Sequence, residues 1–234
     1  MDMKRVICVV LILCFLCATG AMVACGEKPA EDGSTVLAEW KKTYTAGSFG
    51  IVSEEDPFVL LEVEGYGDIR LELFPSVAPI SVQNFLKYVE DGFYDGVVFH
   101  RVIKDFMIQT GGFTQSGDRI VQKTPTYPNI KGEFTSNGVA NYLKHSAGVL
   151  SMARGNAKDS GSSQFFICAT RYPSLDGNYA AFGRVIDEES MAVVSAIEKV
   201  ETGESALYYG DTPVTSSDVP VETVKIKKMK VVQK

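Results

Sequence analysis

The distribution of apolar positions predicts a chain built mainly from short strands. Residues 58–63 form an apolar run, residues 65–68 have the composition of a hairpin turn, and residues 69–73 alternate between apolar and polar side chains. A period of two places successive side chains on opposite faces of a strand. These segments therefore predict two antiparallel strands joined by a tight turn.

The same criteria predict further strands over residues 97–102, 106–109, 147–153, 163–168, 179–185 and 222–232. A turn at Lys104 and Asp105 separates the first two of these. In the last strand the alternation slips by one residue near Lys227, as a β-bulge would make it do. Residues 117–142 are rich in Thr, Pro, Asn and Gly, and we interpret them as a long surface excursion with a short strand or two.

Two segments have the period of a helix. The first opens at Ala78 and Pro79, ends at Asp91 and Gly92, and has apolar side chains at positions 82, 85, 86 and 89. The second covers residues 187–200, with Asp187 as its N-cap and two glutamates in its first turn. Many short strands with two helices predict a mainly β fold, in which a closed antiparallel barrel is capped by the helices.

Arg101 stands out because the alternation places it on the same strand face as Val97 and Phe99. A guanidinium carries five donors in a rigid fork, so beside aromatic, thioether and amide groups it is suited to grip a peptide carbonyl or a polarised nitrogen. The more common explanation for an arginine in a strand is a solvated edge or one half of an ion pair. On residues 99–113 alone, that explanation is favoured.

The N-terminus has the features of a signal peptide over residues 1–24. Lys4 and Arg5 form a positive start, residues 6–18 are apolar but too short for a stable membrane span, and small residues follow. The run ends in Met-Val-Ala-Cys at Cys25, which resembles the lipobox of bacterial lipoproteins, in which the cysteine is lipidated. We therefore expect an extracytoplasmic protein anchored to a bacterial membrane by lipid on Cys25. The alternative is an ordinary signal and a soluble secreted or periplasmic protein.

Residues 25–56 have the polar, turn-prone composition of a tether, apart from Val36, Leu37 and Trp40. Those three side chains predict one helical turn resting on the domain, or a contact for another protein. A length of 234 residues with 45% hydrophobic content suits one domain with appendages. The net charge of −6, without a basic cluster that could follow a phosphate backbone, argues against a nucleic-acid partner.

Cysteine and histidine usage limits the chemistry. Four of the five cysteines lie within residues 1–25, so the folded part keeps only Cys168 and has no intramolecular disulfide. Cys168 lies in an apolar strand pattern, where a buried, inert thiol is expected. His100 and His145 with one cysteine do not form a metal-ligand spacing. We predict no metal and no cofactor.

Four segments resemble the signature segments of the cyclophilin family of peptidyl-prolyl cis-trans isomerases, in the family's order. They are FHRVIKDFMIQTGG at 99–112, GVLSMARG at 148–155, SQFFIC at 163–168 and LDGNYAAFGRV at 175–185. The resemblance covers residues 57–234. It implies an eight-stranded barrel capped by two helices, with the active groove on the outside of the barrel wall, and a monomeric domain that acts on proline-containing polypeptide clients.

By position, the resemblance assigns the site residues. Arg101 matches the catalytic arginine, and Gln109 matches the amide that orients the substrate backbone. The proline pocket corresponds to Phe106, Met107, Phe166 and Leu175, further groove residues to His100 and Gln164, and the peptide-binding backbone to Ala153, Arg154 and Gly155. Ser174 stands where many members have a tryptophan, which leaves cyclosporin sensitivity open. Tyr179 replaces a frequent histidine but keeps a ring and a polar tip that can line the pocket.

The expected reaction is rotation of X-Pro bonds in proteins that fold outside the cytoplasm. Such bonds isomerise over tens to hundreds of seconds without catalysis. An arginine that donates a hydrogen bond to the prolyl nitrogen would favour the twisted state over either planar state. The alternative function is a surface binding module that uses the same barrel to hold partner proteins, with little or no catalysis.

Overall fold

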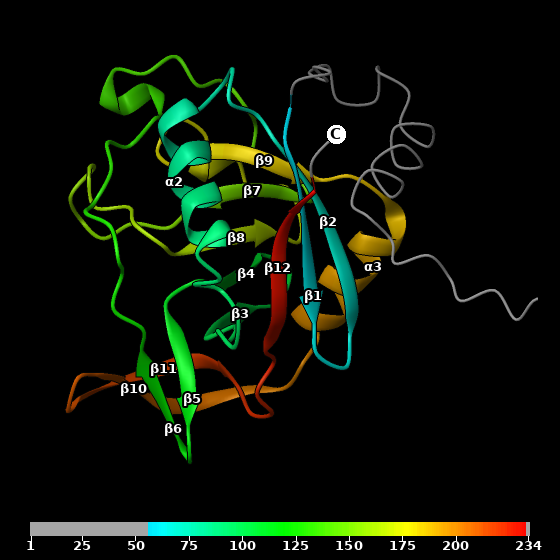
Figure 1. Ribbon diagram of the computed structural model, residues 1–234, viewed down its shortest axis with the longest axis vertical. Helices are drawn as coiled ribbons and strands as arrows, with labels where there is room; N and C mark the ends of the chain where they lie inside the picture. The colour runs from blue at the N-terminus through cyan, green and yellow to red at the C-terminus, as the bar shows by residue number, and fades with distance from the viewer. Residues whose placement is uncertain (1–55, 233–234) are drawn as a thin grey trace, which may run out of the picture. The chain divides into compact units, whose positions relative to one another are not determined.

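A computed structural model describes residues 56–232, which form two β-sheets and two α-helices (Figure 1). The larger sheet has eight strands in the order β12-β1-β2-β9-β7-β8-β4-β3, and every neighbouring pair is antiparallel. Its strands are β1 (Phe58–Val63), β2 (Gly67–Leu73), β3 (Arg101–Ile103), β4 (Met107–Thr110), β7 (Val149–Met152), β8 (Phe165–Cys168), β9 (Ala181–Val185) and β12 (Ile226–Val232). The mainly β prediction is therefore confirmed.

The predicted closure of the barrel is not confirmed, because the sheet is an open, curled half-barrel. Its two terminal strands, β12 and β3, do not form a ladder with each other. A few hydrogen bonds join the segment before β3 to the start of β12 and the residues just before it, among them Gly96 N to Ile226 O at 2.9 Å and Phe99 N to Val224 O at 2.9 Å. Residues 97–100 are too irregular to extend β3, so the strand pairing stops short of closure.

Four strands form a second, smaller sheet in the order β11-β10-β6-β5. Its strands are β5 (Phe113–Ser116), β6 (Arg119–Gln122), β10 (Thr202–Tyr209) and β11 (Thr212–Pro220). Figure 1 shows this sheet at the end of the larger one, with β11 in contact with β3. Residues 117–142 thus begin as the tip of the β5–β6 hairpin, and the rest is irregular apart from a 3-10 turn at Thr135–Asn137.

The helices lie where their sequence signals predict. Helix α2 covers Pro79–Glu90 and has Pro79 in its first turn. Helix α3 covers Glu188–Glu198, and the Asp187 side chain accepts a hydrogen bond from Ser190 N at 2.7 Å as the N-cap. None of the helices within residues 56–232 is long and apolar enough to cross a membrane.

A distant carboxylate caps α2, which lacks a side-chain cap of its own. Buried Glu133 accepts hydrogen bonds from Ile80 N at 3.0 Å and from Ser81 N at 2.7 Å. A negative charge here also opposes the positive end of the helix dipole. The irregular segment after β6 therefore fixes the start of a helix some fifty residues earlier in the chain.

The two faces of the larger sheet bury different clusters. The inner face packs on both helices, for example through Phe85 of α2, Ile197 of α3 and Phe165 of β8, and forms the main core. The outer face carries Met107, Phe166 and the other members of a separate apolar cluster. Because side chains alternate along a strand, one sheet supports both a core and a surface groove.

Two local details of the sequence prediction are confirmed. The ladder between β1 and β12 shifts register between Glu62 and Val63, opposite Lys227, which is the predicted bulge. Asp105 adopts a positive φ of 57° in the predicted turn between β3 and β4, a conformation that aspartate tolerates better than most residues. The signal peptide, Cys25 and the tether with Trp40 fall in residues 1–55, which lie outside the described part of the chain.

Candidate active site

The candidate site is a row of residues directly opposite one another on four strands. Arg101 of β3 faces Gln109 of β4, Gln109 faces Phe166 of β8, and Phe166 faces Ser151 of β7. The neighbours of Arg101 and Phe166 along their strands, Val102 and Phe165, belong to the main core. Three separate stretches of the chain, the β3–β4 hairpin, β7 and β8, thus meet on the outer face of the sheet.

One feature of the predicted strand is wrong. Val97 and Phe99 were expected to share a face with Arg101, but both belong to the main core, as does Val102. The alternation shifts at His100, where the chain is not a regular strand. The shift turns Arg101 outward to the groove, while the apolar residues before it stay in the core.

Apolar side chains line the groove on one side of Arg101. Its lining consists of Arg101, Phe106, Met107, Gln109, Ala153, Arg154, Phe166, Leu175 and Tyr179, around a volume of about 100 Å³. Met107, Phe166 and Leu175 are buried and form one cluster with Cys168. The structure brings together nine of the twelve predicted catalytic and substrate-binding residues, and a proline ring matches a pocket of this chemistry and size.

Polar contacts hold the arginine and the glutamine. Arg101 donates from Nη1 to Gln109 Oε1 at 3.4 Å and from Nε to Asp218 Oδ2 at 3.4 Å. Gln109 in turn donates from Nε2 to Gln164 Oε1 at 3.0 Å. About 40% of the Arg101 side chain is exposed, so the guanidinium is held on one side and open to the groove on the other.

Gln164 reaches Gln109 because two glycines leave space for it. A Cβ on Gly112 would lie 2.4 Å from Gln164 Nε2, and a Cβ on Gly111 would lie 2.4 Å from Ser163 O. Gly111 also has a positive φ of 92°, which side-chain-bearing residues rarely adopt. The pair Gly111-Gly112, expected as a turn at the end of a strand, therefore also permits the close approach of residues 163 and 164.

His100 does not line the groove in this structure. Its side chain is buried, with 3% exposure for the whole residue, and its ring lies 4.6 Å from the Phe113 ring. Burial lowers the pKa of His100 to about 4 from its ordinary value near 6.5, since a charged imidazolium would lose its hydration. His100 is therefore neutral at neutral pH, and its burial keeps the ring out of contact with a substrate in the groove.

We expect the fold to lose stability through His100 as the pH falls from 6.5 to 4. In that window the unfolded chain binds a proton on this residue and the folded chain does not. The contribution to stability is therefore complete above pH 6.5, declines as the pH falls, and is fully lost below about pH 4. The full loss is roughly 3 kcal/mol for a shift of this size. Urea unfolding measures the free energy of unfolding across this pH range. As the pH falls, that free energy should decline less steeply for His100→Gln than for the parent, and parallel declines would contradict the expectation.

The backbone and side chain of residues 153–155 have separate roles. Ala153 N donates to Gln164 O at 3.0 Å, and Gly155 N donates to Ser160 Oγ at 2.9 Å. The Arg154 guanidinium lies 4.7 Å from the centre of the Tyr179 ring and 5.3 Å from that of Phe134. Arg154 thus lines the groove with its side chain, although only its main chain was expected to matter.

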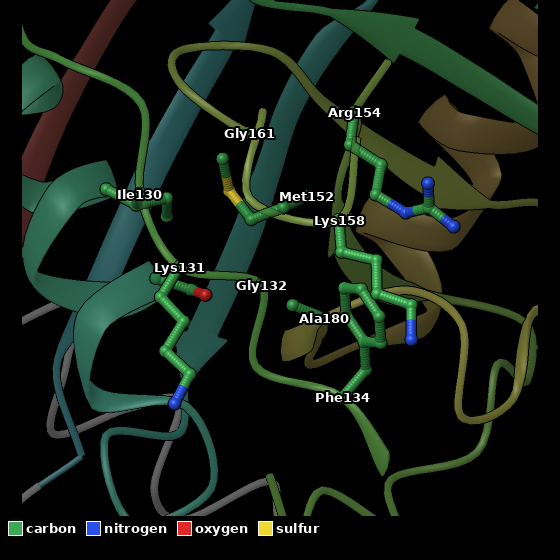
Figure 2. A pocket seen from close by; sticks show the side chains of 10 residues that line it. Ile130, Lys131, Gly132, Phe134, Met152, Arg154, Lys158, Gly161 and Ala180 are labelled. Atoms are coloured by element: carbon green, nitrogen blue, oxygen red, sulfur yellow. The ribbon is translucent and has the colours of Figure 1, made fainter. Parts of the chain in front are cut away.

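Arg154 also borders a second hollow of about 10 Å³ around Gly132 (Figure 2). Lys131 and Lys158 line it, and Lys158 Nζ donates to Ser136 O. A volume of this size holds about one water molecule. The hollow adds positive charge beside the groove and is too small for anything larger than a water molecule.

A buried polar network packs beside Phe166 on the outer face of the sheet. His145 Nε2 lies 3.0 Å from Ser151 Oγ, and His145 Nδ1 lies 3.1 Å from Asp176 Oδ1. The residue types are those of a hydrolase triad, but Ser151 and His145 are fully buried and no substrate reaches them. The His145 ring is stacked on Phe166 at 6.2 Å, so the network fixes the floor of the pocket.

Cys168 has the inert character expected from its sequence. It is buried beside Met107, its partner across the ladder, and burial raises the pKa of its thiol to about 12. A thiol with this pKa has almost no thiolate at neutral pH. Within residues 56–232, no three histidine, cysteine, aspartate or glutamate side chains are grouped so that they could hold a metal ion.

Two residues next to the site were not identified from the sequence. The Tyr172 ring lies 4.1 Å from the ring of Phe106, which lines the pocket. Asp218 contacts Arg101 from the second sheet, across 117 residues of sequence. Tyr172 precedes the Leu-Asp-Gly segment and could have been found from its position, whereas nothing in the local pattern around Asp218 indicates its contact with Arg101.

Comparison with known proteins agrees with the geometry. The family described as cyclophilin type peptidyl-prolyl cis-trans isomerase/CLD matches residues 58–231. The chain is 38% identical over 189 residues to peptidyl-prolyl cis-trans isomerase A of Dickeya dadantii, covering 79% of this chain and 92% of that protein. It is 40% identical over 169 residues to peptidyl-prolyl cis-trans isomerase B of Escherichia coli, covering 69% of this chain and 94% of that protein.

Solved structures give the same result. A cyclophilin-type isomerase of Cryptosporidium parvum superposes with a TM-score of 0.59 at 26% identity, covering 76% of this chain and 99% of that one. The structure of the same protein solved in the presence of the dipeptide Ala-Pro superposes with a TM-score of 0.58 at 27% identity. The chain therefore belongs to the cyclophilin-type peptidyl-prolyl cis-trans isomerase family and is an enzyme of that class.

Proposed function

We propose that this protein catalyses X-Pro isomerisation with Arg101 as its catalytic residue, in polypeptides that fold outside the cytoplasm. The observation that supports the proposal most strongly is the placement of one half-exposed guanidinium at the edge of a pocket of proline size. Among residues 56–232, Nε and Nη1 of Arg101 have hydrogen-bond partners and Nη2 has none. One donor nitrogen of the fork is thus available to a substrate.

The rotation barrier explains why a donor is useful at this position. A peptide bond resists rotation by about 18–20 kcal/mol because the nitrogen lone pair is delocalised into the carbonyl. In the twisted state the lone pair returns to the prolyl nitrogen, which then accepts a hydrogen bond that it cannot accept when planar. A guanidinium aimed at that nitrogen therefore stabilises the transition state more than either ground state, as catalysis requires.

The pocket binds the proline ring, and Gln109 orients the substrate backbone. Phe106, Met107, Phe166 and Leu175 hold the proline ring by apolar contact while the acyl part rotates. Gln109, fixed by Gln164 and Arg101, offers an amide to the substrate backbone. The presence of Ala-Pro with the Cryptosporidium parvum relative supports a proline-containing substrate of this kind. No nucleophile and no proton transfer is needed.

The direct test is an isomerisation assay on the full chain with short X-Pro peptides. NMR exchange spectroscopy on such a peptide measures the cis-trans rate without a coupled protease. Acceleration over the uncatalysed rate, saturating with peptide concentration, supports the proposal. A folded chain that binds the peptide but leaves its isomerisation rate unchanged would refute it, and the domain would then be a binding module.

We also propose that Cys25 is lipidated and holds the enzyme at the outer side of a bacterial membrane. The supporting features are the positive start at Lys4 and Arg5, the short apolar run and the lipobox-like residues before Cys25. Without residues 1–24, which include Asp2, Lys4 and Arg5, the net charge of −6 becomes −7. An acidic surface does not adhere to anionic lipid, so acyl chains would have to provide the anchor.

Changing Cys25 to serine should abolish incorporation of labelled fatty acid. In cells grown with a labelled fatty acid, the parent should carry the label and Cys25→Ser should not. Cys17→Ser is the matched control, because it removes a thiol from the apolar run of the same signal and should keep the label. Equal labelling of the two variants would contradict lipidation at Cys25. An unlabelled parent would contradict the anchor altogether and favour a soluble exported protein.

A further inference from the structure

We infer that Asp218 is a positioning residue for the catalytic arginine. This inference rests on the proposed function, because it concerns how Arg101 is aimed. Asp218 lies on β11 of the second sheet and is the only acidic side chain within ion-pair distance of Arg101 among residues 56–232. The second sheet thus has a function in the active site beyond its packing.

The contact fixes the guanidinium at a second point. Asp218 Oδ2 accepts from Arg101 Nε at 3.4 Å, while Gln109 Oε1 accepts from Nη1 at 3.4 Å. One contact alone would leave the planar group free to pivot about it. Two contacts at different nitrogens restrict the plane of the guanidinium and so the direction of Nη2. Pre-orientation of a charged donor is what makes it effective in a transition state.

The position of Asp218 is itself set by buried contacts. Val219, the next residue, is buried in a cluster with Val98, Phe113 and Leu207. Val98 lies three residues before Arg101, so the same apolar cluster locates both ends of the ion pair. On the other side of Asp218, Ser217 Oγ donates to Asp218 Oδ1 at 3.3 Å. The carboxylate is therefore held by its neighbours in the chain as well as by the arginine.

This ion pair orients the Arg101 guanidinium but adds little to the stability of the fold. The side chains of Arg101 and Asp218 are 40% and 34% exposed, and ion pairs with that much solvent access stabilise a fold very little. Losing the carboxylate should therefore leave the melting temperature almost unchanged. Any loss of activity would then come from misdirection of the arginine and not from unfolding.

The test compares kcat and KM of full-length variants for one X-Pro peptide. We expect Asp218→Ala to lower kcat by about three- to tenfold with little change in KM, because orientation affects mainly the transition state. Asp218→Glu should recover part of the loss, since it restores a carboxylate on a longer stem. Asp211→Ala is the matched control, because it removes an exposed carboxylate from the turn between β10 and β11.

A double-mutant cycle separates positioning from a general electrostatic effect. Once Arg101 is alanine, Asp218→Ala should cause no further loss. Three results would overturn the inference: equal kcat for Asp218→Ala and Asp211→Ala, fully additive losses in the cycle, or a rise in kcat on removal of Asp218, which would mean that the pair restrains the arginine. An inactive parent would instead overturn the proposed function and this inference together, so the two failures are distinguishable.

Discussion

Replacing Arg101 with alanine should lower kcat/KM for X-Pro isomerisation by about 10- to 100-fold. A hydrogen bond from a charged donor contributes about 1.5–3 kcal/mol, and each 1.36 kcal/mol of transition-state stabilisation corresponds to a tenfold rate change. The loss should fall mainly on kcat, because the prolyl nitrogen accepts the bond only in the twisted state. Steady-state measurement of kcat and KM on a series of X-Pro peptides checks this split.

Two comparisons make the Arg101 result specific. Lys104→Ala removes an exposed cation from the turn that follows β3 and should leave kcat/KM unchanged. Peptide binding by Arg101→Ala, measured by NMR titration, should persist because the apolar pocket is intact. A variant that keeps its full activity would show that another group supplies the donor, and a variant that loses binding in proportion to activity would show that Arg101 acts as a binding residue.

The family resemblance could group the residues that line the groove because they belong to short, continuous segments. Residues 99–112 and 163–168 each carry neighbours that pair across adjacent strands, and the family resemblance assigns them to one groove. The strand period alone grouped Arg101 with Val97 and Phe99, which lie in the core. The helices were predicted because their signals are local: Pro79 begins one and Asp187 caps the other. Local chemistry was sufficient for these elements.

Long-range contacts could not be predicted in the same way. Strands β10 and β11 alternate poorly between buried and exposed positions, and Pro213 and Pro220 lie within β11, so their segment has little strand signal. These strands form because they pair with each other and with β6. Whether the curled sheet closes also depends on irregular residues around Phe99, where the strand period gives no information. The contact of Asp218 with Arg101 depends on both the placement of β11 and the irregular residues around Phe99, so the sequence did not indicate it.

The largest effect on stability is expected at Phe85, whose ring lies at the centre of the main core. Its ring centroid is 5.1 Å from Phe165, 5.2 Å from Phe182 and 5.5 Å from Tyr94. Phe85→Ala removes these contacts and leaves a cavity that rigid strands cannot fill, so unfolding should become easier by about 3–5 kcal/mol. Urea unfolding followed by circular dichroism measures this change in the free energy of unfolding. Ile80→Ala, at an exposed position of the same helix, is the control, and its free energy of unfolding should stay within about 0.5 kcal/mol of the parent.

Catalysis should respond differently from stability to this change. Phe165 packs on Phe85 inside the sheet, whereas Phe166 faces the groove, so the core and the proline pocket share a strand but not a face. As long as Phe85→Ala remains folded at the assay temperature, its kcat/KM should stay within about twofold of the parent, because the contacts of Arg101 and Gln109 lie on the outer face. A collapse of kcat in a fully folded Phe85→Ala protein would mean that the core sets the geometry of the groove through β8. In that case the two faces would be coupled, and the pocket would depend on core packing as well as on its own polar contacts.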